Sequence, residues 1–376
     1  MLNKSTYPLV FFLFIFLPVI NGRTVADVPE DSTATVIREL GLRESSVPSR
    51  DMPGWRKPKK ILVTGATPET IALLTPVAGG AEIIGVADFF PQSMPVTEVD
   101  IVMGICRPVI MEAARHASWF HAYSAGVEAC VRHPVLKENP DLIMTNNKGV
   151  ASPSLAEHAI TMAMMLERRM QIYINNQAQR KWAWEAVPRG TIRDLKGRTL
   201  LVAGLGGIGT QVALRAHALG MKVIATRNSS RRGPEYVEYV GLPDELPELA
   251  ARADYVVNAL PLTPETTGLF DGAFFRAMKN DAYFITVGRG KSVVTDDLVA
   301  ALKAGELAGA GLDVTDPEPL PAEHPLWGME NVIITPHTGG ITAGAGERRM
   351  VLVRENLRRY VGGEPLLNLV DIKKGY

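Results

Sequence analysis

The sequence predicts an α/β protein of two domains with parallel β-sheets, in which the second domain is inserted into the first. Two observations lead to this prediction. From residue 60 onward, short apolar segments of strand length alternate with segments of helix length, an order typical of a parallel sheet covered by helices on both faces. The chain has 376 residues, and because a domain usually holds about 100–200 residues, this length favours two domains.

The first series of strands is predicted at residues 61–64, 82–86, 100–103, 119–123 and 142–145. A helix is expected to begin at Ser152-Pro153-Ser154, because serine and proline suit the cap and first turn of a helix. This helix should run to about residue 170. Residues 171–198 are then expected to form a long polar connection to the second series.

The second series is predicted at residues 199–203, 222–226, 254–258, 282–286, 309–313 and 332–335. A last helix is expected at 343–360, followed by a short apolar segment at 366–368. We therefore assign residues 60–160 and 338–376 to one domain, expected to bind the substrate. Residues 161–337 are assigned to the inserted, nucleotide-binding domain.

The N-terminal residues 1–26 resemble a secretory signal peptide. Lys4 precedes the apolar run 9–20, which is too short to span a bilayer comfortably but suits the core of a signal peptide. No Arg-Arg pair precedes this run, so the sequence does not support export of a prefolded protein. Export is expected, and a cytoplasmic protein that starts at Met52 is the alternative. Residues 27–59 are interpreted as a polar extension with one short helix at 34–40.

The composition excludes some classes of partner. There are 40 basic and 40 acidic residues, which leaves no net charge to attract nucleic acid or an anionic membrane. Cys106 and Cys130 are too few for a disulfide framework and lack the spacing of metal ligands. We expect both to be small buried apolar residues in preference to a disulfide.

A glycine-rich turn stands between the first strand of the second series and its helix. It reads Gly204-Leu205-Gly206-Gly207-Ile208-Gly209. Gly204 permits a tight turn, Gly206 lets the backbone approach a pyrophosphate, and Gly209 allows the helix to pack closely on the strand. Since the N–H groups at the helix start attract phosphate, the turn predicts a Rossmann-like domain that binds a dinucleotide.

The loop after the next strand indicates which dinucleotide is bound. Rossmann-like domains usually place an acid there, which accepts hydrogen bonds from a ribose 2′-hydroxyl. This chain instead carries three arginines and three polar residues: Arg227, Asn228, Ser229, Ser230, Arg231 and Arg232. Because guanidinium groups suit a 2′-phosphate, NADP(H) is predicted in preference to NAD(H).

Four chemically active side chains follow predicted strands of the inserted domain: Arg289, Asp313, Glu318 and His337. They are expected to converge, because the carboxyl ends of strands in an open sheet line the ligand crevice. An arginine offers a planar fork for a carboxylate, and histidine donates protons near neutral pH. A carboxylate beside the histidine favours the charged imidazolium. This set suits reduction of a 2-oxo acid. The other histidines, His158 among them, lack such neighbours and are left outside the site.

With these motifs, the chain resembles the D-isomer-specific 2-hydroxyacid dehydrogenase family over residues 60–370. Its members carry a dinucleotide fingerprint followed by an arginine, a glutamate and a histidine. Arg289 matches the family's substrate-binding arginine, although Thr286 stands where asparagine is common. Glu318 matches the acid that pairs with the catalytic histidine, and His337 matches that histidine.

The resemblance assigns further residues to the site. Ala125 and Gly126 match the loop whose backbone N–H groups hold the substrate carboxylate, with Glu128 where aspartate is usual. Asp313 matches the residue that binds the nicotinamide amide. The other cofactor contacts implied outside the arginine loop are Gly204, Gly206, Gly207, Ile208, Gly209, Leu260, Pro261, Thr266, Val287, Gly288, His337 and Gly339.

The expected reaction is hydride transfer from NADPH to a small 2-oxo acid such as glyoxylate or hydroxypyruvate, which gives the D-2-hydroxy acid. His337 is expected to supply the proton, Arg289 to bind the carboxylate, and Glu318 to keep His337 charged. Two alternatives are oxidation of phosphoglycerate with NAD and a non-catalytic protein that senses NAD(P) on the same scaffold. The resemblance also implies a homodimer built through residues 170–195.

Overall fold

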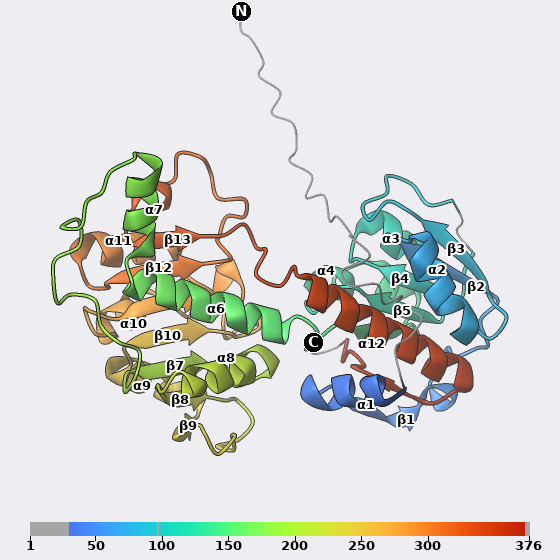
Figure 1. Ribbon diagram of the computed structural model, residues 1–376. Helices are drawn as coiled ribbons and strands as arrows, with labels where there is room; N and C mark the ends of the chain where they lie inside the picture. The colour runs from blue at the N-terminus through green and yellow to red at the C-terminus, as the bar shows by residue number, and fades with distance from the viewer. Residues whose placement is uncertain (1–29, 96–97, 373–376) are drawn as a thin grey trace, which may run out of the picture.

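The computed structural model describes residues 30–95 and 98–372. These residues form two lobes, each built around a parallel β-sheet with helices on its faces (Figure 1). The chain builds a five-stranded sheet, crosses to a seven-stranded sheet, and returns to the first lobe through α12 (Ala343–Gly362). This architecture confirms the predicted α/β fold with two parallel sheets.

The five-stranded lobe has the strand order β3-β2-β4-β5-β6. Its strands are β2 (Lys60–Thr64), β3 (Glu82–Val86), β4 (Ile101–Gly104), β5 (Trp119–Ala122) and β6 (Ile143–Asn146). The segments between them contain α2 (Pro68–Leu74), η3 (Thr75–Val77), α3 (Pro108–Ala113), α4 (Glu128–Val131) and α5 (Val135–Glu138). All five strands lie within one residue of their predicted positions.

The described N-terminal residues are part of this lobe. They form α1 (Glu30–Glu39), β1 (Glu44–Pro48) and η2 (Ser49–Asp51), and β1 pairs antiparallel with β14 (Pro365–Leu367). Leu40 is buried in a small core with Leu352 of α12. The interpretation of 27–59 as an extension therefore needs correction for these residues, because their apolar side chains cover α12 and the C-terminal strand.

The seven-stranded lobe has the strand order β13-β12-β11-β10-β7-β8-β9. Its strands are β7 (Thr199–Ala203), β8 (Lys222–Thr226), β9 (Tyr239–Gly241), β10 (Tyr255–Asn258), β11 (Tyr283–Thr286), β12 (Gly309–Leu312) and β13 (Val332–Ile334). Its helices after β7 are α8 (Gly207–Ala218), η4 (Pro243–Glu245), α9 (Leu246–Arg252), α10 (Gly272–Ala277), η5 (Gly290–Ser292), α11 (Thr295–Ala304) and η6 (Pro325–Gly328). Of these strands, only β9 was absent from the prediction; it is a three-residue strand at the edge of the sheet, and its first residue is exposed.

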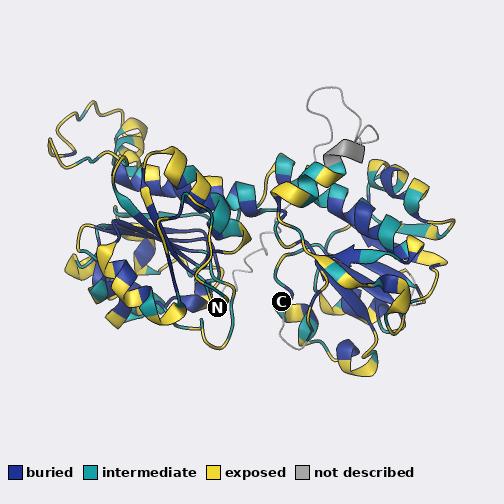
Figure 2. Cartoon of the chain, turned by 90° about the horizontal axis from the view of Figure 1, so that it is seen from below, coloured by how far each residue is buried: buried dark blue, intermediate teal, exposed yellow. Residues whose placement is uncertain are grey.

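Both faces of this sheet are buried, which explains why its strands are continuous apolar runs. Along β7, Leu200 and Val202 pack into the core on one face, while Leu201 and Ala203 pack into the core on the other. Figure 2 shows the buried strands of both lobes in dark blue, with exposed residues on the outer sides of the helices.

The chain enters the seven-stranded lobe through α6 (Ser152–Glu167), and α7 (Met170–Ala178) follows on the side of that lobe far from the five-stranded lobe (Figure 1). Ala156, Ala159 and Ala163 of α6 pack in the same core as α8, so α6 packs against the seven-stranded lobe from its first turns onward. The polar connection expected after residue 170 begins with α7. Because α7 buries no residue, its sequence carries no apolar stripe that would have indicated a helix.

Cys106 and Cys130 form a disulfide, with their Cα atoms 4.9 Å apart. The prediction of two separate buried thiols is therefore wrong. Cys106 follows β4 and Cys130 lies in α4, which follows β5. Since β4 and β5 are neighbours in the sheet, the segments at their carboxyl ends meet, and the spacing of the two cysteines along the chain does not reveal this.

Within residues 30–95 and 98–372, no helix is long and apolar enough to cross a membrane. The apolar run 9–20, on which the signal-peptide prediction depends, lies outside the described residues.

Candidate active site

The glycine-rich turn joins β7 to α8 at the carboxyl edge of the seven-stranded sheet. Gly204 has a φ of +97°, a conformation that glycine adopts without steric cost. A Cβ on Gly209 would overlap the carbonyl oxygen of Gly204 and lie 2.7 Å from Val202. Glycine at 209 therefore lets α8 pack closely against β7, as predicted.

This turn fits the pyrophosphate of a dinucleotide. A Cβ on Gly206 would meet no atom within 4 Å, so the backbone is open to a ligand there. Gly206 is the N-cap of α8 and provides no side-chain cap, which leaves the N–H groups of Gly207, half-buried Ile208 and the following residue for phosphate oxygens. Leu260, from the loop after β10, lies against Gly204 on the other side of the turn.

The arginines of the loop after β8 differ in their partners. Arg227 donates from Nη1 to the carbonyl oxygen of Arg232 at 3.0 Å. Arg231 instead forms an ion pair of 2.8 Å with Glu245 and donates to the Tyr239 hydroxyl at 2.9 Å. The hydrogen bond from Arg231 is the main cause that lowers the pKa of Glu245 to about 2.

Among the ion pairs of the described residues, Arg231 is thus paired with a carboxylate, whereas Arg227 and Arg232 are not. Asn228 and Ser229 are exposed beside it. Arg227, Asn228 and Ser229 are therefore at least partly open to solvent. The charge of Arg231 is balanced by Glu245.

Arg289 follows β11 in a segment that is held by a buried polar network. Asn258 donates to the hydroxyls of Thr286 at 3.0 Å and Ser292 at 2.8 Å. Ser292 in turn donates to the carbonyl oxygen of Arg289 at 2.7 Å. Asn258, Thr286 and Ser292 are fully buried, so the network is shielded from water and fixes the backbone of Arg289.

The two glycines beside Arg289 allow close approach of neighbouring segments. A Cβ on Gly288 would lie 2.7 Å from the carbonyl oxygen of Leu260, and a Cβ on Gly290 would overlap the backbone of Thr315. Arg289 therefore emerges where the loops after β10 and β12 come together. The remaining predicted residues of this region are buried Val287 and the loop residues Pro261 and Thr266, whose hydroxyl donates to the Pro261 carbonyl at 2.7 Å.

His337 and Glu318 form a hydrogen bond of 2.7 Å between Nδ1 and Oε1. This bond raises the pKa of His337, while burial and, more weakly, the charge of Arg289 oppose the increase. The same bond lowers the pKa of Glu318. An imidazolium held in this way presents its other nitrogen, Nε2, as a proton donor. The charge of Arg289 also helps to lower the pKa of Glu318.

Asp313 holds the backbone that precedes and follows His337. Its carboxylate is buried and accepts hydrogen bonds from the N–H groups of Thr338 at 3.0 Å and Gly339 at 3.1 Å, and from the Thr335 hydroxyl at 2.7 Å. His158 of α6 lies 3.5 Å from the same carboxylate. The sequence does not indicate His158, because its neighbours along the chain mark no site and its partners, Asp313 and Thr335, come from distant segments.

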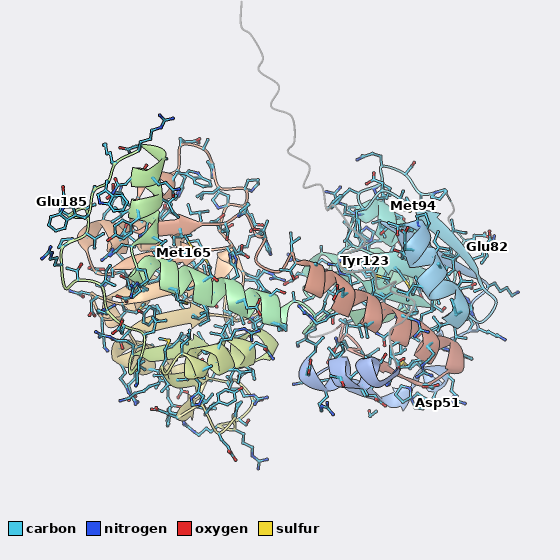
Figure 3. The ribbon with its side chains drawn as sticks, viewed as in Figure 1. Asp51, Glu82, Met94, Tyr123, Met165 and Glu185 are labelled. Atoms are coloured by element: carbon cyan, nitrogen blue, oxygen red, sulfur yellow. A yellow bond between two sulfur atoms is a disulfide. The ribbon has the colours of Figure 1, made fainter. Side chains whose placement is uncertain are left out.

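The predicted substrate loop meets Arg289 from the other lobe. Tyr123, which precedes this loop, lies on the side of the five-stranded lobe that faces the other lobe (Figure 3). Asn146 donates to the Ala125 carbonyl at 2.8 Å, which fixes the loop. A Cβ on Gly126 would overlap the guanidinium of Arg289. Arg289 also forms an ion pair of 3.4 Å with Glu128.

Residues from both lobes thus combine a glycine-rich turn that suits a dinucleotide, a half-buried arginine and a histidine whose pKa is raised by its hydrogen bond with a glutamate. A site of this kind defines a two-lobed, NAD(P)-dependent oxidoreductase that acts on a carbonyl or hydroxyl carbon.

Comparison with known proteins places the chain within this class. Residues 160–339 match the family model described as D-isomer specific 2-hydroxyacid dehydrogenase, NAD binding domain. Glyoxylate/hydroxypyruvate reductase A of Escherichia fergusonii is 30% identical over 276 residues, which cover 72% of this chain and 85% of that protein. The chain belongs to the D-isomer-specific 2-hydroxyacid dehydrogenase family.

Solved structures agree with this assignment. A D-isomer specific 2-hydroxyacid dehydrogenase family protein from Aeromonas salmonicida has a TM-score of 0.72 and 30% identity, covering 84% of this chain and 100% of that one. The NADPH-dependent glyoxylate/hydroxypyruvate reductase from Sinorhizobium meliloti, in complex with NADP and sulfate, has a TM-score of 0.70 and 27% identity, covering 85% and 100%.

Proposed function

We propose that this enzyme reduces a small 2-oxo acid of the glyoxylate or hydroxypyruvate type to the D-2-hydroxy acid, with NADPH preferred over NADH. The observation that carries the proposal is the 2.7 Å hydrogen bond between His337 and Glu318 beside Arg289. The names of the Escherichia and Sinorhizobium relatives, both reductases of these two acids, support the substrate class.

Each residue of the trio has a separate task in this proposal. Bound NADPH supplies the hydride that C2 of the substrate receives. Arg289 binds the substrate carboxylate with its planar fork and polarises the carbonyl group. His337 donates a proton from Nε2 to the carbonyl oxygen, which becomes the hydroxyl of the product. Glu318 orients the imidazole and keeps it charged.

The direct test follows oxidation of NADPH and of NADH by the purified protein, with glyoxylate, hydroxypyruvate, pyruvate and phenylpyruvate as acceptors. We expect turnover with the smaller acids and a higher kcat/KM for NADPH. Tight cofactor binding without turnover of any acid would contradict the proposal and favour a cofactor-sensing protein. A marked preference for oxidising phosphoglycerate with NAD would contradict it in a different way.

Variants of the trio test the roles of the residues. His337→Ala and Arg289→Ala should each lower kcat/KM by about 100- to 10,000-fold, while the Kd for NADPH should change little. His116→Ala is a matched control, because His116 is exposed on the five-stranded lobe. If either of the first two variants retains the activity of the control, the role given to that residue is wrong.

We also propose that the enzyme is a homodimer built through α7 and the segment after it. Four large apolar side chains of this region are exposed: Met170, Ile174, Trp182 and Trp184. The side-chain amide of Gln171 is buried without a hydrogen-bond partner. Exposed aromatic and apolar side chains in one region are a mark of a protein interface, and a second copy of the chain is the occupant that the family resemblance implies.

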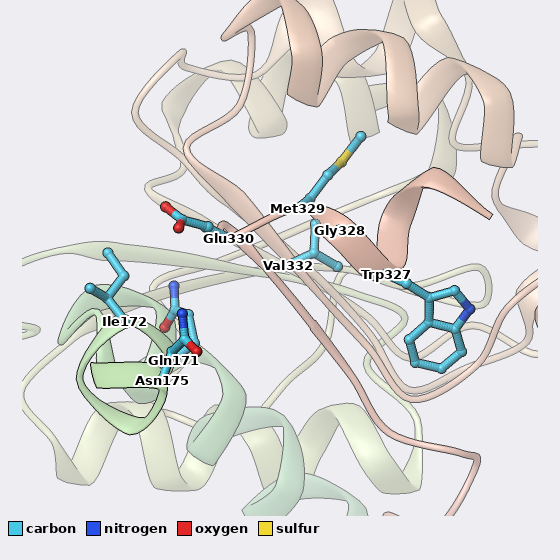
Figure 4. Close-up of a pocket in the computed structure, with 8 residues that line it drawn as sticks. All are labelled: Gln171, Ile172, Asn175, Trp327, Gly328, Met329, Glu330 and Val332. Atoms are coloured by element: carbon cyan, nitrogen blue, oxygen red, sulfur yellow. The ribbon is translucent and has the colours of Figure 1, made fainter. Parts of the chain in front are cut away.

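Figure 4 shows a hollow on this surface, with Gln171, Ile172 and Asn175 of α7 on one side and Trp327 and Val332 on the other. Light scattering on the purified chain should give twice the mass of the monomer. Ile174→Asp and Trp182→Ser should together give a monomer, and Leu214→Asp, an exposed position on α8, should leave the dimer intact. A wild-type protein that is monomeric at micromolar concentration would refute this proposal.

Export of the chain is a third proposal. It rests on the signal-like residues 1–26 and is supported by the disulfide between Cys106 and Cys130, since disulfides persist mainly in oxidising compartments. Cell fractionation and mass spectrometry of the full chain should find a protein that begins near residue 27 outside the cytoplasm. A full-length cytoplasmic protein with two free thiols would contradict export.

A further inference from the structure

We propose that Glu128 occupies the position of the substrate carboxylate on Arg289 in the ligand-free enzyme, and that it sets the affinity for small 2-oxo acids by competing with them. The inference rests on the proposed function in one respect, because it takes Arg289 as the residue that binds the substrate carboxylate. Glu128 is then a specificity-determining residue that acts through Arg289.

The side chains of Arg289 and Glu128 both lie next to Gly126. A Cβ on Gly126 would overlap Nη2 of Arg289 and would lie 2.6 Å from Oε2 of Glu128. The guanidinium and the carboxylate therefore lie against the same backbone atom. That backbone belongs to the loop whose N–H groups are expected to hold the substrate carboxylate, so Glu128 places a carboxylate group next to both partners that the substrate needs.

The N–H donors of the Arg289 guanidinium already have two partners, Gly288 and Glu128. Nη1 already donates to the carbonyl oxygen of Gly288 at 2.9 Å. The nearest ion-pair contact of Glu128 is with Nε, at 3.4 Å, on the part of the guanidinium that does not carry the Gly288 bond. A substrate carboxylate that binds Arg289 side-on, through Nε and Nη2, would use this same part of the guanidinium. Two carboxylates cannot share it without strong repulsion.

The ion pair between Arg289 and Glu128 can be exchanged for one with a substrate carboxylate. The side chains of Arg289 and Glu128 are 34% and 29% exposed, and the 3.4 Å separation is long for a charge-assisted hydrogen bond. Partly exposed ion pairs contribute little to stability. Glu128 is therefore held loosely enough for an incoming carboxylate to displace it, while its backbone stays fixed next to Cys130, which is tied to Cys106.

The length of the side chain matters, because the resemblance to the family implies an aspartate at this position. Glutamate is longer by one methylene group, which carries its carboxylate closer to the guanidinium. An aspartate at 128 keeps the negative charge and loses this reach. The variants Glu128→Gln and Glu128→Asp therefore separate the effect of charge from the effect of contact.

The experiment measures binding of oxamate, an unreactive analogue of a 2-oxo acid, by calorimetry in the presence of NADP⁺. Glu128→Gln should lower the Kd for oxamate by about fivefold, and Glu128→Asp should give a Kd between those of Glu128→Gln and the wild type. Glu82→Gln is the matched control, because Glu82 is exposed at the start of β3 and lies at the outer side of the lobe (Figure 3). Its Kd should equal that of the wild type.

Steady-state kinetics provide the second readout. In Glu128→Gln the KM for glyoxylate should fall by a factor similar to the Kd for oxamate, so the change should appear mainly in KM and not in kcat. A Kd that stays unchanged or rises would overturn the inference, and a rise would mean that Glu128 positions Arg289 for binding. Failure of the proposed function would be recognised separately, as a wild type that turns over no 2-oxo acid. The oxamate Kd values of the variants would still test the inference in that case.

Discussion

At the scale of single residues, the proposed role of His337 as proton donor means that its pairing with Glu318 should govern how activity depends on pH. The hydrogen bond with Glu318 raises the pKa of His337 in the folded enzyme. The proposed reduction needs the charged imidazolium, so the rate should fall as the pH rises through this pKa. Without the negative charge of Glu318, the pKa is lower and the rate falls at a lower pH.

We therefore expect Glu318→Gln to lose activity mainly on the alkaline side. At pH 8 kcat/KM should fall by roughly tenfold or more, and at pH 6 by much less. The measurement is the pH profile of kcat/KM for glyoxylate reduction. Glu323→Gln is the control, because Glu323 is exposed in the same loop. A profile for Glu318→Gln that matches the control would show that Glu318 does not maintain the charge of His337.

The sequence could predict those residues whose place follows from a strand end. Arg289, Glu318 and His337 follow strands of one parallel sheet, and the carboxyl ends of such strands share an edge. It could not predict the partners that depend on tertiary contacts. Ser292 holds the Arg289 backbone, and His158 reaches Asp313 from α6, yet no local pattern distinguishes either from an ordinary polar residue.

At the scale of secondary-structure elements, the loop after β8 should determine the choice of cofactor mainly through Arg227. Arg231 is balanced by Glu245, whereas Arg227 has no carboxylate partner among the described ion pairs. Arg227→Ala should raise the KM for NADPH by at least about tenfold and leave the KM for NADH nearly unchanged. Arg231→Ala should raise it by only about twofold.

Steady-state kinetics with both cofactors check this difference. Lys222→Ala is a useful control, because Lys222 is exposed at the opposite end of β8. An equal loss in Arg227→Ala and Arg231→Ala would mean that Arg231 leaves Glu245 to bind the 2′-phosphate, and the order of importance argued from the ion pair would be wrong.

The disulfide joins two further elements, the loop after β4 and α4. It closes a segment with a sequence separation of 24, and a crosslink over a loop of this length stabilises the folded protein by about 3 kcal/mol in the chain-entropy model. The double variant Cys106→Ser, Cys130→Ser should therefore unfold at a lower denaturant concentration. A wild type treated with reductant should match it, and a double variant as stable as the oxidised wild type would exclude a stabilising crosslink.

Elements were predictable from the sequence where burial gives a regular pattern. The strands of both sheets are apolar runs because both of their faces are covered, and all of them except β9 were predicted to within one residue. By contrast, α7 has no buried apolar residue, and β1 pairs with β14 across most of the length of the chain. The first gives no periodic signal, and the second depends on a contact that no local sequence pattern encodes.

At the scale of the whole molecule, the five-stranded lobe is closed by the two ends of the described chain. β1 pairs with β14, and Ser49 donates from its N–H to the Glu364 carbonyl at 3.0 Å. Leu40 is buried against α12 together with Leu367. The lobe that carries the predicted substrate loop therefore includes residues that precede Met52.

A chain that begins at Met52 should accordingly be less stable than one that begins at residue 27. Loss of the burial of Leu40 alone corresponds to about 2 kcal/mol, and removal of β1 also leaves the N–H and C=O groups of β14 without their partners. Thermal unfolding of the two purified chains measures the difference. Because α12 packs against α1 and returns the chain from one lobe to the other, the shorter chain should also lose activity at temperatures where the longer one remains active. Equal stability and equal activity of the two chains would mean that α1 and β1 are dispensable, and would restore Met52 as a workable start.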